Sequence, residues 1–168
     1  MDRAVGRELR AAESFLAPEG SSLLEYERSW ATLRANFERH HESLVARTRD
    51  QARRVVPNLS AVVGERIAAR LVAAAGGVSE LARMRAPRLQ LLGSRRRPSP
   101  ERGPRYGLLY GADRMADLPP DRRGAYARSL AALAAIAARA DATTRADLTR
   151  TLVPRRDRRI EQLRRRSR

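Results

Sequence analysis

The stretch PNLSAVVGERIAARLVAAAGG, residues 57–77, decides the fold class of this chain. Its larger apolar residues recur at the spacing of one helix face. They are Val62, Val63, Ile67, Leu71 and Val72. Pro57 marks the start of the stretch, and Gly76 or Gly77 supplies the left-handed residue that commonly ends a helix. The stretch therefore predicts a helix that packs on a core.

Downstream, the pattern stays helical. Short helices are predicted around residues 79–84 and 145–152 and over 154–166, and a long one from Asp121 to about Ala140. The segment YGLLY, residues 106–110, is predicted to be a short strand or extended piece. The fold class is therefore all-α, with at most a minimal β element.

Upstream, residues 1–56 are predicted to form a helical hairpin, a short coiled coil. Its long arm, roughly 22–55, carries an apolar stripe at alternating spacings of three and four. The residues for dimerisation or helix packing are Leu23, Tyr26, Trp30, Leu33, Phe37 and Leu44. A short arm from Val5 to Leu16 cannot cover this stripe, so we expect antiparallel self-association through Trp30 and Phe37.

The chain is strongly basic, and the charge is unevenly placed. All 35 basic residues are arginine, against 19 acidic residues, for a net charge of +16. Residues 1–56 are nearly neutral, with 10 arginines and 9 acids, whereas residues 57–168 carry 25 arginines and 10 acids. Such an excess favours a polyanionic partner, and the arginine fork binds phosphate in two places at once.

Several other function classes are disfavoured. The 168 residues include no cysteine, which excludes disulfides and thiolate metal sites, and no run nears the ~18 apolar residues of a membrane helix. His40 and His41 are adjacent and cannot face one ion from a helix. No phosphate loop or catalytic motif is visible. We expect a soluble, non-catalytic protein without metal or cofactor.

Three arginine-rich features are candidates for nucleic-acid binding. The helix after Asp121 begins with Arg122 and Arg123, and it carries Arg128 and Arg139 three turns apart, with Ala132 and Ala135 between them as a flat floor. Periodicity alone fits an alanine-rich core helix with two salt-bridged arginines equally well. The segment LLGSRRRPSPERGPRYGLLY, residues 91–110, holds a further group. Its arginines are Arg95, Arg96, Arg97, Arg102 and Arg105. The third feature, residues 154–168, has eight arginines and two acids and favours unspecific contact with a polyanion.

The order of these motifs resembles the Nop domain of box C/D ribonucleoprotein scaffold proteins and a related spliceosomal factor. The matching residues are PNLSAVVGERIAARLVAAAGGVSELARMRAPRLQLLG, PRYGLLY and RRGAYARSLAALAAIAARAD, within about residues 50–165. The resemblance implies a coiled coil used for dimerisation, then an all-helical domain that binds a kink-turn RNA together with a small kink-turn-binding protein. Residues after Gly93 and from Arg122 to Arg139 would face this RNA or protein.

The chain departs from the family pattern at three places. Ser94 to Pro98 replaces a short helix, and Leu133 stands where lysine is common. Only 56 residues precede Pro57, too few for a coiled coil and the domain that holds the methyltransferase fibrillarin in archaeal members. We therefore expect a truncated form, and direct fibrillarin binding is not expected.

The predicted domains are a hairpin over 1–56, a Nop domain over 57–153 and a basic helical tail over 154–168. The predicted function is a ribonucleoprotein scaffold in guide-directed 2′-O-methylation of rRNA or tRNA, cytoplasmic in an archaeal cell and nucleolar in a eukaryote. It would form a homodimer, or a heterodimer with a full-length relative. Two alternatives stay open: an assembly protein that has kept the fold but lost specific RNA contact, and a generic basic nucleic-acid-binding protein.

Overall fold

The computed structural model describes residues 23–94 and 107–165. These residues form seven α-helices and one 3-10 helix, with no strand among them. The all-α prediction is therefore confirmed. The chain divides into two compact units, residues 1–46 and 47–168. The domain boundaries expected at Pro57 and Pro154 stay predictions.

Helix α2 (Leu23–Val55) corresponds to the predicted long arm of the hairpin. Its sequence is continuous in good helix formers, with no glycine or proline between its ends. The short arm predicted from Val5 to Leu16 lies outside the described residues. The observed bounds of α2 therefore agree with those predicted for the long arm, roughly residues 22–55.

The stretch 57–77 forms two helices, α3 (Pro57–Val63) and α4 (Glu65–Ala75), where one was predicted. The chain turns at Gly64, whose φ is +85°, and a Cβ at this position would collide with the carboxylate of Asp113. Only glycine tolerates both conditions. The predicted stop is confirmed, because Gly76 caps α4 in the left-handed conformation.

Two short helices, α5 (Val78–Arg83) and α6 (Ala86–Gln90), follow, and a 3-10 helix, η2 (Leu108–Gly111), replaces the predicted strand. The strand prediction was wrong because YGLLY satisfies its backbone locally. The Tyr110 amide donates to the Gly107 carbonyl at 3.1 Å, and the Ala112 amide donates to the Leu109 carbonyl at 3.1 Å. Leu109 is fully buried, so the apolar run serves the core as one helical turn.

Helix α7 (Pro120–Ala142) is the centre of the 47–168 unit, and it packs against α3, α5, α6 and η2. Most of its buried residues are alanines, whose small side chains let neighbouring helices approach closely. Tyr126 and Leu130 fill the larger spaces, and burial raises the pKa of the Tyr126 phenol to about 12. The predicted long helix is therefore confirmed as the core of this unit.

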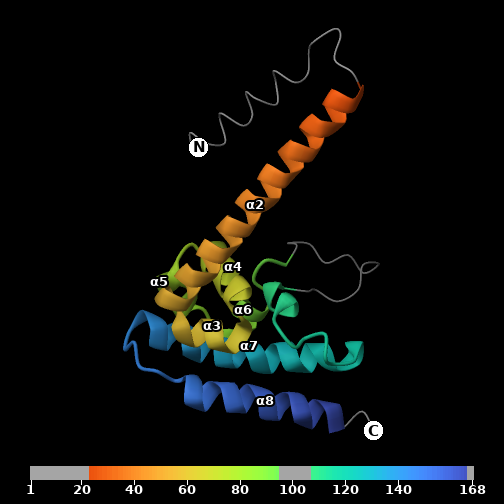
Figure 1. Ribbon diagram of the computed structural model, residues 1–168. Helices are drawn as coiled ribbons and strands as arrows, with labels where there is room; N and C mark the ends of the chain where they lie inside the picture. Colours follow the sequence, from red (N-terminus) through yellow and green to blue (C-terminus); the bar gives the residue numbers. More distant parts are fainter. Residues whose placement is uncertain (1–22, 95–106, 166–168) are drawn as a thin grey trace. The chain divides into compact units, whose positions relative to one another are not determined.

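Helix α8 (Thr149–Arg165) lies beside α7 in the same unit (Figure 1). It runs through Pro154, where the sequence had predicted two separate helices. Pro154 lacks the N–H that would bond to the preceding turn, which weakens but does not end the helix. Burial of Leu152, Ile160 and Leu163 on one side holds both parts of α8 on the core.

Candidate nucleic-acid interface

One narrow stripe of α7 is exposed. It consists of Arg128, Ala132, Ile136 and Arg139, which follow one another at spacings of four, four and three. The predicted floor between the arginines needs one correction, because Ala135 is buried against the core. Ile136, which is 39% exposed, takes part in its place. The stripe therefore offers a mostly apolar floor with a guanidinium near each end.

The four arginines predicted on α7 differ in how they are held. Arg122 pairs with Asp121 at 2.9 Å, and Arg123 donates from Nε to the Leu118 carbonyl at 2.9 Å. Arg139 donates from Nε to the Ala82 carbonyl at 3.3 Å, which ties α7 to α5. Arg128 has no hydrogen bond or ion pair with any other described residue, and it is exposed. Arg128 is thus the most available of the four.

The predicted loop arginines, Arg95, Arg96, Arg97, Arg102 and Arg105, lie outside the described residues. The borders of their segment are described, however, and they lie against each other. The Leu108 amide donates to the Leu92 carbonyl at 2.8 Å, and Gly107 packs directly on the Gln90 carbonyl. Both ends of the segment are therefore anchored to one place on the domain, as the apolar flanks predicted.

Asn58 and Asp141 form a buried link between the start of α3 and the end of α7. The Asp141 carboxylate accepts bonds from the Asn58 amide at 3.1 Å, the Asn58 Nδ2 at 2.7 Å and the Leu59 amide at 2.9 Å. Asn58 also donates to the Ala146 carbonyl and accepts from the Leu148 amide. These two residues of the matched motifs are therefore structural, and they position α7 and the turn before α8.

One side of α8 carries arginines that are neutralised by carboxylates. Asp157 pairs with Arg156 at 2.9 Å and with Arg114 at 3.2 Å, and Arg164 pairs with Asp117 at 3.1 Å. Arg156 also donates to the Ala61 carbonyl at 2.8 Å, at the end of α3. This side of α8 holds the helix on the domain, and most of its positive charge is neutralised by ion pairs within the domain.

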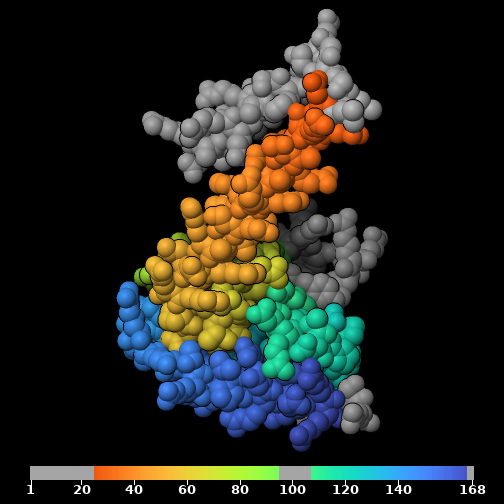
Figure 2. Space-filling model, viewed as in Figure 1, coloured from red at the N-terminus to blue at the C-terminus, as the bar shows by residue number. Residues whose placement is uncertain are grey.

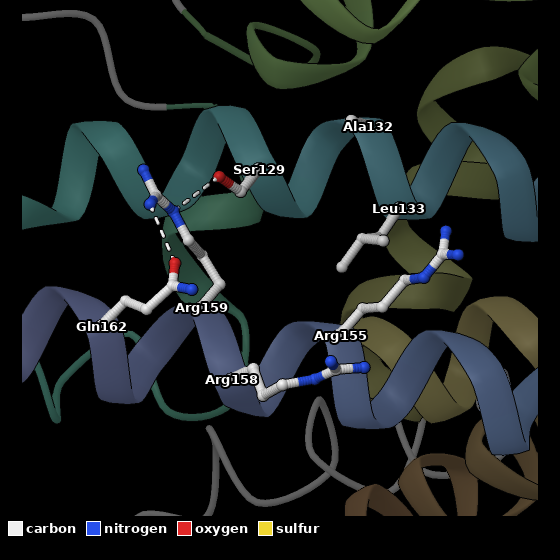
Figure 3. Close-up of a pocket in the computed structure, with 7 residues that line it drawn as sticks. All are labelled: Ser129, Ala132, Leu133, Arg155, Arg158, Arg159 and Gln162. Atoms are coloured by element: carbon white, nitrogen blue, oxygen red, sulfur yellow. Dashed lines mark hydrogen bonds between the residues drawn. The ribbon is translucent and has the colours of Figure 1, made fainter.

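A groove between α7 and α8 lies on a different side of α8 from these ion pairs. It has a volume of about 530 Å³, and Figure 3 shows its lining side chains. They are Ser129, Ala132 and Leu133 from α7 and Arg155, Arg158, Arg159 and Gln162 from α8. Sequence reasoning had treated these arginines only as part of a basic tail. Arg158 and Arg159 lie three and four residues after Arg155, and this spacing was the signal that could have placed them on one side of a helix.

Residues 23–94 and 107–165 contain no group of three or more histidine, aspartate or glutamate side chains arranged to hold a metal ion. Within the same ranges, no helix is both long enough and apolar enough to cross a bilayer.

The predicted packing stripe on α2 can be followed from Tyr26 to Leu44. Tyr26, Trp30, Phe37 and Leu44 are 42%, 57%, 69% and 50% exposed, and Leu33 is half-buried. The Tyr26 and Trp30 rings meet edge to face, with centroids 6.3 Å apart. Leu23 lies in the first turn of α2, and its side chain is outside the description. The stripe is therefore present on the helix and largely uncovered.

Comparison with known proteins gives a consistent match. The family model described as "Nop: snoRNA binding domain, fibrillarin" matches residues 25–162. Nucleolar protein 58 of Scheffersomyces stipitis is 36% identical over 137 residues, which are 78% of this chain and 27% of that protein. Putative nucleolar protein 5-3 of Arabidopsis thaliana is 34% identical over 99 residues, 56% of this chain and 22% of that protein. The chain thus spans about a quarter of these relatives' length.

Among solved structures, a chain from the crystal structure of a fibrillarin/Nop5p complex superposes with a TM-score of 0.67. The match covers 96% of this chain and 61% of that chain, at 24% sequence identity. At this level of identity the likeness supports the helical fold, and it agrees with the family model over the same region.

Proposed function

Because this chain belongs to the Nop family of snoRNA-binding domains, we propose that it is a non-catalytic RNA-binding scaffold of a ribonucleoprotein. In this proposal it recognises a kink-turn RNA of box C/D type together with a small kink-turn-binding protein. The bound particle acts in guide-directed 2′-O-methylation of rRNA or tRNA. The relatives from fungi and a plant are named nucleolar proteins, so a nucleolar location is proposed for a eukaryotic source.

The exposed stripe of α7 carries this proposal. Arg128 and Arg139 bracket the small side chain of Ala132, which lets a sugar-phosphate backbone approach the helix closely. The segment 95–106, with five arginines, is anchored through the contact between Leu92 and Leu108. Residues 57–168 carry 25 arginines and only 10 acids, so both features sit in a strongly positive part of the chain.

Binding to a kink-turn RNA, with and without its small protein partner, tests the proposal. The folded protein should bind, and its affinity should fall steeply with salt because counterions are released. Arg128→Gln should weaken binding about fivefold at physiological salt and reduce the salt slope by about one. Fluorescence anisotropy at several salt concentrations measures both quantities.

Arg70→Gln is the matched control, because Arg70 is exposed on α4 and has no ion pair within the described residues. It should leave the affinity and the salt slope nearly unchanged. A folded protein that binds no kink-turn RNA in either condition would refute the proposal. Equal affinity for duplex DNA at matched salt would instead favour generic nucleic-acid binding.

We also propose that the stripe on α2 pairs with a second helix, in a homodimer or with a full-length relative. Trp30→Glu combined with Phe37→Glu should convert a self-associated protein to a monomer, because two charges would enter the apolar contact. Light scattering after size exclusion measures the mass. Ala35→Glu, at an exposed position on another side of α2, should leave the mass unchanged. A wild-type protein that stays monomeric at high concentration contradicts the proposal.

A further inference from the structure

The groove between α7 and α8 carries three positive charges without a carboxylate. Arg155, Arg158 and Arg159 line it, and no aspartate or glutamate does. None of the three has an ion pair within the residues that the structure describes. The contrast with Arg156 and Arg164 on the same helix is direct, because those two have carboxylate partners. The positive charge of the groove is therefore left for a ligand.

The shape of the groove also suits a ligand. It is a wide depression, about 530 Å³ in volume and largely open to solvent, so it suits an extended strand laid along it rather than an enclosed small molecule. Arg159 is held in place, because it donates from Nε to the Ser129 Oγ at 3.2 Å and from Nη1 to the Gln162 Oε1 at 3.3 Å (Figure 3). A guanidinium that is already positioned loses less conformational entropy when it binds an anion.

Apolar side chains from α7 form the other side of the groove. Leu133 points from α7 toward α8, and the Arg155 side chain rises toward α7 beside it (Figure 3). Ala132 belongs both to this groove and to the exposed stripe of α7. In Figure 2, the atoms of α8 (blue) form a continuous part of the molecular surface. The groove and the stripe are therefore parts of one surface.

We propose that this groove binds the phosphodiester backbone of the RNA that contacts the α7 stripe, as a second site that extends the first. This inference rests on the proposed function. Arg155 and Arg158 bind phosphate oxygens, Arg159 contributes from its fixed position, and Leu133 packs against a ribose or base.

An RNA strand suits the groove better than an acidic protein segment. The shared Ala132 makes the groove continuous with the stripe, and Arg128 lies one helical turn before Ala132 on the same side of α7. A single backbone can therefore follow both in succession. The spread of three guanidinium groups over one helix turn and the apolar strip of Ala132 and Leu133 match a chain with repeated phosphates and flat bases.

The test compares four full-length proteins in titrations against one kink-turn RNA, with its small protein partner present, from 50 to 300 mM salt. The groove variant is Arg155→Gln with Arg158→Gln, and the control is Arg70→Gln with Arg85→Gln, which removes the same charge from exposed positions on α4 and before α6. The groove variant should bind about tenfold more weakly at physiological salt. Its salt slope should be smaller by about 1.4–1.8, which corresponds to two lost phosphate contacts.

The fourth protein carries Leu133→Lys and tests the opposite direction. A lysine at this half-buried position reaches the groove with its ammonium group, so the salt slope should grow by about one. The affinity should rise about threefold at 50 mM salt, where the added phosphate contact outweighs the lost packing of Leu133. This result is informative even if the double arginine variant folds poorly. Circular dichroism of all four proteins checks that each is folded.

The outcomes separate this inference from the proposed function. If the wild type binds the RNA but the groove variant matches the control and Leu133→Lys has no effect, the groove site is refuted and the α7 stripe stands. If the folded wild type does not bind, both fall. A groove variant that loses binding to poly-glutamate but keeps its RNA affinity would show that the groove takes an acidic protein, which also overturns the inference.

Discussion

Replacing Asp141 with alanine is expected to lower the free energy of unfolding by about 4 kcal/mol. Asp141 supplies both carboxylate oxygens to the start of α3, where Pro57 has no N–H and the next two amides, from Asn58 and Leu59, need acceptors. The residue is only 5% exposed, so water cannot replace the lost bonds without opening the domain. Each orphaned buried donor costs about 1–3 kcal/mol.

The carboxylate also meets the positive end of the α3 dipole, which adds to its stabilising effect. Asp141→Asn keeps the shape but presents an NH₂ group to one of the donors, so we expect a smaller loss of about 2 kcal/mol. Because domains of this size have only about 5–15 kcal/mol of stability, Asp141→Ala should lower the urea midpoint by at least about a quarter.

Urea unfolding followed by circular dichroism at 222 nm measures these losses. Asp121→Ala is the control, because Asp121 is exposed in the first turn of the same helix and makes only a surface ion pair with Arg122. That change should cost less than about 1 kcal/mol. Equal losses for Asp141→Ala and Asp121→Ala would contradict the structural role assigned to the buried carboxylate.

The hydrogen bonds between Asn58 and Asp141 are an example of a contact that could not be predicted from the sequence. The two residues are 83 positions apart, and neither periodicity nor composition relates them. Helices such as α2 and α7 could be predicted, since helix-forming residues and the spacing of the larger side chains are local properties of each segment. The break at Gly64 could not, because the apolar spacing continues across the glycine, whereas its backbone takes a φ of +85° that ends α3.

The residues of the candidate site also fall into some that could be predicted from the sequence and others that could not. The exposure of Arg128 could be predicted, because the side of a helix on which a residue lies follows from spacing along that helix alone. Arg155 and Arg159 were placed in a tail, since Pro154 suggested a break and nothing in the sequence indicated that α7 lies beside α8. Likewise, Arg123 and Arg139 bond to the carbonyls of Leu118 and Ala82, contacts that only the fold reveals.

Gly107→Ala is expected to destabilise the domain by about 3 kcal/mol and to weaken RNA binding as well. A Cβ at Gly107 would overlap the Gln90 carbonyl and would press on the Leu92 carbonyl, both of which belong to the backbone and cannot rotate away. The Leu108 amide donates to the same Leu92 carbonyl at 2.8 Å, so relief of the overlap breaks this bond. Overpacking of this kind costs about 1–3 kcal/mol, and the lost hydrogen bond adds to it.

Gly124→Ala is the matched control, with an effect of opposite sign. Gly124 lies within α7, and a Cβ there would meet only the Tyr110 hydroxyl at an ordinary distance of 3.5 Å. Alanine in a helix interior should therefore stabilise the domain by about 0.5–1 kcal/mol. Thermal and urea unfolding of both variants measure these changes.

The effect on RNA binding follows from the position of Gly107 at the border of the arginine segment 95–106. If that segment contacts RNA from anchored ends, Gly107→Ala should raise the Kd about fivefold at a temperature where the domain is still folded, because the arginines no longer start from one fixed place. Gly124→Ala should leave the Kd unchanged. A Gly107→Ala protein that is destabilised but binds RNA with wild-type affinity would show that the segment acts without its anchor, and the RNA contact would then rest on α7 and α8.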